Sequence, residues 1–165
     1  MDFTFDFKNN MGDHLKVALS NYDKQIVEIF SKNPDILNID FYNVSLERKV
    51  RNSKFLNPRI LIDICDTLAN FMFEHPNSVL TYLCDPVSEV ERHNNNLSPQ
   101  QYRSNLFSKL FEYYTISHRI EDFIDGIIHI EEKSTENGGI YAHFIYHKNL
   151  KPQIEVISKI LLLDK

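Results

Sequence analysis

Hydrophobic residues alternate with a period of two before residue 47, and from residue 57 onward they also recur at helical spacing. In residues 3–7, three phenylalanines alternate with polar residues, and residues 14–22 resume the alternation after a turn that contains Gly12. This pattern is typical of two half-buried strands joined as a hairpin. Residues 25–30 and 36–46 predict two further strands, with a turn between them.

Two helices are predicted by their starting residues as well as by their hydrophobic spacing. Asn57 with Pro58, and Ser98 with Pro99, each place a capping residue and a proline where a helix can begin. Gln101 completes a capping box after Ser98. A third helix is predicted at the end of the chain, where isoleucine and leucine recur at helical spacing.

The remaining strands complete the order ββββ-α-β-α-ββ-α. Residues 78–85 are almost continuously apolar, which indicates a central strand that is covered on both sides. Residues 120–133 and 139–148 predict a second hairpin. The order predicts an α+β fold in one globular domain, 1–165, with a mostly antiparallel sheet of about seven strands and helices packed on one face. The other sheet face would be open to solvent or to a partner.

Composition narrows the class of protein. The formal net charge of −5 disfavours nucleic acid as a general partner, because such proteins normally carry a basic surface. No apolar run approaches the roughly 20 residues of a membrane span, and the first residues lack the features of a signal peptide. Two cysteines are too few for a disulfide framework. We therefore expect a cytoplasmic protein with reduced, buried Cys65 and Cys84.

Motifs that bind cofactors are not found in the sequence. There is no glycine-rich phosphate loop, dinucleotide fingerprint, paired CxxC, HExxH or serine elbow. An acyl-CoA-binding loop of the acetyltransferase type would need a basic, glycine-rich turn between a strand and a helix, and none is present. We expect no cofactor and assign no catalytic residue.

Metal binding is also not predicted. His143 and His147 lie too far apart on one strand to share an ion, and His129 opposite His143 would supply two ligands where zinc normally needs three or four. The loop after residue 85 carries several carboxylates but no glycine, which a calcium loop requires for its sharp turn. We interpret the histidines as structural and this loop as a solvated connection.

Two groups of charged residues are candidates for contact with a ligand or partner. Arg48, Lys49 and Arg51 lie in a basic stretch before the first helix, where a phosphate, a nucleic acid or an acidic partner could dock. The alternative is a solvated connector. Arg103 lies near a helix N-terminus, which does not favour a cation, so we expect a partner to hold it, with Asp85 as the candidate.

Several stretches together resemble a family of small bacterial proteins known only as a domain of unknown function. The similar stretches are residues 57–85, the aromatic run that starts at Arg103, and the hairpin that ends with Phe144, His147 and Asn149. The resemblance covers most of the chain and implies its fold but no activity. It points to Arg103 and His147 as positions that matter. The loop between the strand at 78–85 and the Arg103 helix is longer here than in the family.

Two functions are compatible with the sequence. The leading prediction is a non-catalytic module that binds another protein, of the antitoxin, immunity or defence-accessory type, with exposed aromatic residues such as Tyr141 or Tyr146 on an open sheet face. The alternative is a small enzyme or a nucleotide- or ligand-binding protein with a pocket near Asp85, Arg103 and His147. The oligomeric state is not predicted.

Overall fold

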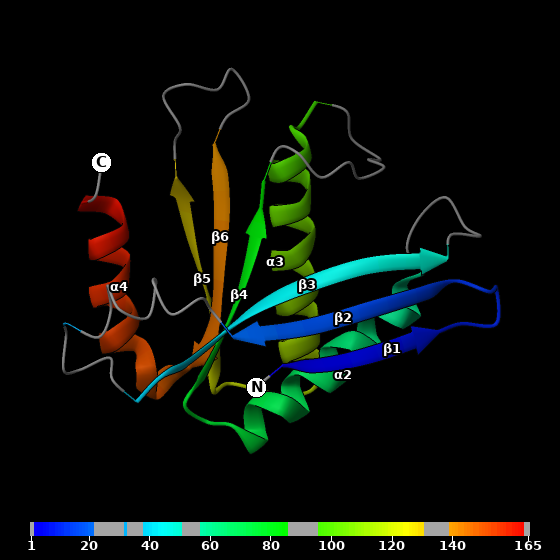
Figure 1. Cartoon of the computed structure of the whole chain (residues 1–165), viewed down its shortest axis with the longest axis horizontal. Coiled ribbons are helices and arrows are strands. Elements are labelled where there is room, and N and C mark those ends of the chain that lie inside the picture. Colours follow the sequence, from blue (N-terminus) through cyan, green and yellow to red (C-terminus); the bar gives the residue numbers. More distant parts are fainter. Residues whose placement is uncertain are drawn as a thin grey trace.

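The structure, a computed structural model, describes residues 2–21, 32, 38–50, 57–85, 96–130 and 139–163. Six strands form one sheet in the order β1-β2-β3-β4-β6-β5 (Figure 1). The strands are β1 Phe3–Lys8, β2 His14–Asn21, β3 Asp40–Val50, β4 Ser78–Cys84, β5 Phe123–Ile130 and β6 Ile140–His147. The helices are α2 Pro58–Glu74, α3 Pro99–Ser117 and α4 Lys151–Leu163, with a short 3-10 helix, Lys148–Leu150, before α4.

The predicted α+β class is confirmed, with a six-stranded sheet rather than one of about seven strands. The strand predicted over residues 25–30 lies outside the described residues. Neighbouring strands are antiparallel except β3 and β4, which run parallel and are connected through α2. Both predicted hairpins are present, β1–β2 and β5–β6. Gly12, in the first hairpin's turn, has φ of 82°, which a residue with a Cβ rarely adopts.

The helices begin at the predicted caps. The Asn57 side chain accepts a hydrogen bond from the backbone N–H of Arg59 at 2.9 Å. The Ser98 hydroxyl accepts from the backbone N–H of Gln101 at 3.2 Å, and the Gln101 side chain accepts in return from the backbone N–H of Ser98. These bonds satisfy N–H groups that the first turn of a helix leaves without a partner.

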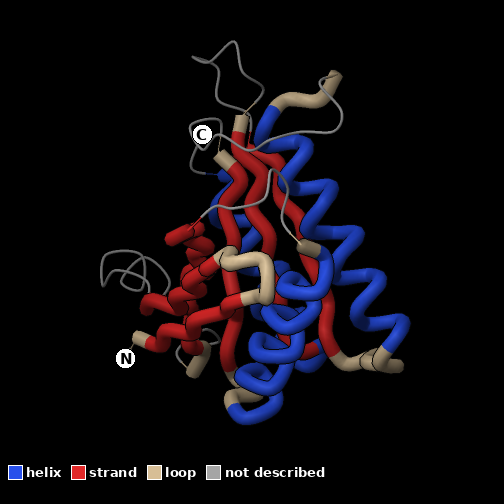
Figure 2. The backbone as a smooth tube through the Cα atoms, turned by 90° about the vertical axis from the view of Figure 1, so that its right-hand side faces the viewer, coloured by secondary structure: helices blue, strands red, loops and turns tan. Residues whose placement is uncertain are grey.

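The expectation that all helices cover one sheet face is wrong for α4. On one face, Leu80 of β4 and Ile145 of β6 pack with α2, and α3 runs along the same strands (Figures 1 and 2). On the other face, Val79 and Phe144 pack against Ile157 of α4. The physical reason is that consecutive residues of β4 and β6 are buried, so both sides of these strands need cover.

The prediction that Tyr141 and Tyr146 lie exposed on an open sheet face is therefore also wrong. Tyr146 is only 5% exposed and belongs to the core beneath α4. Tyr141 is half-buried, and its ring stacks on His129 at a centroid distance of 4.3 Å.

Candidate functional site

The structure brings two of the predicted site residues together. Arg103 is 8% exposed, and its Nη2 donates to the backbone carbonyl of Asp85 and lies 3.4 Å from the Asp85 carboxylate. The expected pairing of Arg103 with Asp85 is thus confirmed. Arg103 points to the sheet because it follows Gln100 by three residues on the inner side of α3, and both are buried. The pair fastens the start of α3 to the end of β4.

His147 does not join this pair. The register places Cys84 opposite Tyr141 and Val79 opposite Tyr146, so His147 and Asp85 lie at opposite ends of neighbouring strands. Seven residues of strand correspond to about 23 Å, which is too far for both groups to act on one small ligand. His147 instead accepts a hydrogen bond from the backbone N–H of Asn149 at 3.3 Å and starts the 3-10 helix. The single pocket predicted around these residues is not formed.

The basic residues before α2 have acidic neighbours. Arg48 donates from Nη2 to the buried carboxylate of Asp13 at 3.1 Å, which ties the end of β3 to the β1–β2 turn. Lys49 Nζ lies 2.5 Å from Glu47 at the surface. Arg51 lies outside the described residues. Arg48 therefore has a structural partner, and its charge is largely balanced inside the fold.

A chain of three polar side chains under α3 was not predicted. The Ser104 hydroxyl lies 2.8 Å from Nε2 of His143, and Nδ1 of His143 lies 3.0 Å from Oδ1 of Asp125. Ser104 is 4% exposed and His143 is fully buried. The three residues come from α3, β6 and β5, so no local sequence motif predicts that they meet. His129, which was considered as the neighbour of His143, lies opposite Tyr141 instead.

The Asp125 carboxylate decides which groups donate and which accept among Ser104, His143 and Asp125. An ionised Asp125 can only accept, so Nδ1 of His143 donates to it; with the imidazole neutral, Nε2 then accepts from the Ser104 hydroxyl. The order serine, histidine, aspartate is that of a catalytic triad. A nucleophile must be reached by its substrate, however, and the Ser104 side chain is sealed between α3 and the sheet. In this structure the three groups satisfy one another and hold α3 in place.

The cysteines are not poised for nucleophilic chemistry. Burial raises the pKa of the Cys84 thiol to about 11, against a smaller lowering by Arg103, and burial raises the pKa of Cys65 to about 12. Cys84 has no exposed surface. Cys65 is only half-buried, so the expectation that both cysteines are buried is wrong for it. Both thiols are nevertheless protonated at neutral pH.

The parallel strands β3 and β4 diverge soon after they meet. They pair only from Asp40 opposite Ser78 to Asn43 opposite Thr81, and then β3 continues to Val50 beside β2 while β4 continues beside β6. Figure 1 shows the two halves of the sheet opening from this point. We call the diverging parts, residues 44–50 of β3 and 82–84 of β4, the strand fork.

The strand fork carries exposed apolar side chains. Leu46 is 37% exposed and Val50 is 44% exposed on β3, and Leu83 is 43% exposed on β4. Earlier in the same strands, where β3 and β4 pair, Phe41, Tyr42, Val79 and Leu80 are all buried. The exposed apolar surface of these two strands is thus confined to the part where they separate.

The described residues form neither a metal-binding cluster nor a membrane-spanning helix. No group of three or more His, Cys, Asp or Glu side chains within the described ranges is placed to hold a metal ion. Among the same ranges, no helix has the length and apolar character needed to cross a membrane.

No family model, curated protein or solved structure matches this chain. The resemblance to a bacterial family of unknown function therefore stays a prediction.

Proposed function

We propose that the protein binds an extended small molecule along the strand fork, and that this ligand carries amide groups and a phosphate-bearing end, as an acyl-coenzyme A does. The observation that carries the proposal is the early separation of two parallel strands. Ligands of sheets with parallel strands commonly bind beyond the carboxyl ends of those strands, where neighbouring connections diverge.

We propose amide groups in the ligand because amides can form hydrogen bonds with the backbone edges of the strand fork. Beyond Asn43 and Thr81, β3 and β4 no longer pair with each other, and no strand of the described residues lies between them, so their facing edges can offer N–H and C=O groups to a third partner. An extended chain with amides can bond to such an edge as an added strand would. Leu46, on the α2 side of the sheet, and Leu83, on the α4 side, would contact apolar parts of that chain on its two faces.

We propose a phosphate-bearing end because the N-terminus of α2 could bind an anion. This helix follows β3 in the chain, has no acidic residue in its first turn, and carries Arg59 there. The Asn57 side chain already accepts from the Arg59 N–H, but the positive end of the helix dipole still favours an anion nearby. Residues 51–56 contain no glycine and lie outside the described residues, so the proposal assigns the phosphate contacts to Arg59 and the helix start rather than to a glycine-rich loop.

Calorimetry and thermal unfolding with acetyl-CoA test the proposal. At a ligand concentration of about 100 times the dissociation constant, binding stabilises the folded state by about 2.7 kcal/mol, which corresponds to a rise in Tm of roughly 5–10 °C for a chain of this size. Pantetheine and adenosine 3′,5′-bisphosphate each carry one half of the recognised chemistry and are expected to bind more weakly. Equal binding of the bisphosphate and acetyl-CoA would show that the fork is not used.

A matched pair of variants locates the site. Leu83→Glu places a charge in the fork, and Ile116→Glu places the same charge on α3 at a position that is 69% exposed. We expect Leu83→Glu to abolish the Tm rise with acetyl-CoA and Ile116→Glu to keep it. Loss of the response in both variants, or in neither, would contradict binding at the fork.

A second candidate function is the predicted protein-interaction module. The observation in its favour is the exposure of Tyr113 and Ile116 near the end of α3, at 63% and 69%, since exposed aromatic and aliphatic side chains mark many interfaces. A pull-down with the tagged protein, compared with a Tyr113→Lys, Ile116→Lys variant, tests it. One stoichiometric partner that the variant fails to capture would support this function, and equal capture by both baits would count against it.

A further inference from the structure

The edge strand β5 lacks the features that protect most sheet edges. It ends the sheet, and no described strand pairs with its outer side. Its sequence, FIDGIIHI, has no lysine, arginine or proline, and its one acidic side chain, Asp125, is turned inward to His143. The opposite edge, β1, exposes Asp6 and Lys8 instead. Natural proteins normally guard long apolar edges with charge, proline or cover.

We propose that β5 pairs antiparallel with β5 of a second copy of this chain, with Ile127 opposite Ile127 of that copy at the two-fold axis. The two sheets then continue into one another, and the free N–H and C=O groups of both edges find partners. The proposal does not depend on the ligand proposed for the strand fork, because β5 lies at the other end of the β4-β6-β5 half of the sheet.

This register is self-complementary on both faces of the strand. On the face toward α3, Ile127, which is 49% exposed, meets its own copy, and Asp125 stands opposite the copy's His129 rather than opposite another carboxylate. On the face toward α4, Gly126 stands opposite the copy's Ile128, so a residue without a side chain faces a large one.

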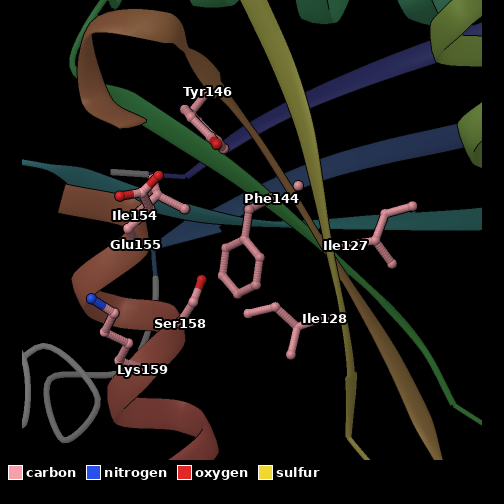
Figure 3. Close-up of a pocket in the computed structure, with 9 residues that line it drawn as sticks. Ile127, Ile128, Phe144, Tyr146, Ile154, Glu155, Ser158 and Lys159 are labelled. Atoms are coloured by element: carbon pink, nitrogen blue, oxygen red, sulfur yellow. The ribbon is translucent and has the colours of Figure 1, made fainter. Parts of the chain in front are cut away.

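The ring of Tyr146 lies over Gly126, where a Cβ would meet its Cε1 at 3.4 Å, so the copy's Ile128 would pack beside that ring. A groove of about 290 Å³ lies between the β5–β6 hairpin and α4, and Gly126, Ile128, Phe144 and Ile154 are among the residues that line it. Figure 3 shows Ile128 and Phe144 on the side of α4 and Ile127 pointing away from it. An isoleucine of the second copy, placed opposite Gly126, would lie at the β5 side of this groove, whose α4 side also carries Glu155 and Lys159. A second copy therefore buries apolar surface as well as pairing backbone.

Sedimentation measures the assembly, and an engineered cysteine reports the register. We expect the wild-type chain to be a dimer at high micromolar concentration, and Ile127→Lys to weaken the dimer by roughly a hundredfold or more, because it brings two like charges together at the axis. Ile116→Lys, at an apolar position on α3 that is more exposed than Ile127 (69% against 49%), should leave the dimer unchanged. A monomeric wild type, or a dimer that Ile127→Lys leaves intact, overturns the proposal.

The cysteine variants are made in a Cys65→Ser background, with Cys84 buried. Directly opposed residues have Cβ atoms about 4.5–5.5 Å apart, so Ile127→Cys is expected to form an intermolecular disulfide under mild oxidation. In this register, two copies of residue 129 lie about 13 Å apart along the strands, so His129→Cys should remain unlinked. Linkage of residue 129, or its absence at residue 127 in a folded protein, contradicts the register.

Discussion

Nδ1 of His143 lies 3.0 Å from Oδ1 of Asp125, and this buried pair joins β6 to β5 beneath α3. Ser104 completes the chain from the helix side, at 2.8 Å from Nε2. The Ser108 hydroxyl lies 3.5 Å from the other carboxylate oxygen of Asp125. Each of these four side chains thus has a partner, and removal of the central imidazole would leave the Ser104 hydroxyl without one and the Asp125 carboxylate with only the long contact to Ser108.

His143→Phe tests the role of that chain in stability. We expect the free energy of unfolding to fall by about 1–3 kcal/mol, because the buried Asp125 carboxylate and the Ser104 hydroxyl each lose a hydrogen-bond partner. Urea unfolding followed by circular dichroism measures it. Asp125→Asn, which keeps the size and one acceptor oxygen, should cost less. A loss below about 1 kcal/mol for His143→Phe would show that Asp125 is solvated in the folded protein.

Arg103 is expected to be replaceable only in part by another cation. Arg103→Met removes the donors to the Asp85 backbone carbonyl and carboxylate and should cost about 1–3 kcal/mol. Arg103→Lys keeps the charge but not the planar pair of donors, so it should recover less than half of that loss. Urea unfolding compares the two variants. Full recovery by lysine would mean that only the charge at this position contributes to stability.

Both thiols should resist alkylation while the protein is folded. With the pKa of Cys84 raised to about 11 by burial, roughly one thiol in a thousand is ionised at pH 8, and Cys84 has no exposed surface. Iodoacetamide is expected to add to neither cysteine in buffer and to both in urea, as read by intact mass. Rapid modification of Cys84 in the folded protein would contradict its burial.

The protein is expected to lose stability at alkaline pH. Burial, together with a 2.6 Å hydrogen bond donated to Asp66, raises the pKa of the Tyr114 phenol well above its usual value. A group with a raised pKa in the folded state stabilises below its unfolded pKa, near 10 for tyrosine, and loses this contribution as pH rises further. The thiols act in the same direction from about pH 9. Tyr114→Phe should therefore flatten the fall in unfolding free energy above pH 10, measured by urea unfolding from pH 8 to 11. An unchanged slope would contradict the Tyr114 contribution.

The sequence by itself determined the local elements. Alternating residues in β1 and β2 predicted a hairpin because successive strand residues face opposite sides. Asn57 and the Ser98–Gln101 capping box marked the starts of α2 and α3 because their side chains bond to N–H groups within the first turn. The nearly continuous apolar run of β4 also predicted cover on both sides of this strand. The prediction that all helices pack on one sheet face was inconsistent with that cover.

The tertiary structure alone decided which distant residues meet. Ser104 lies 39 residues from His143, and His143 lies 18 residues from Asp125; no propensity or motif encodes such a contact. The parallel pairing of β3 with β4, the point where they separate and the place of α4 on the second face are non-local in the same way. They depend on how whole elements pack to bury apolar surface on both sides of β4 and β6. The free energy of that packing comes from many contacts between distant residues, so no single stretch of sequence predicts it.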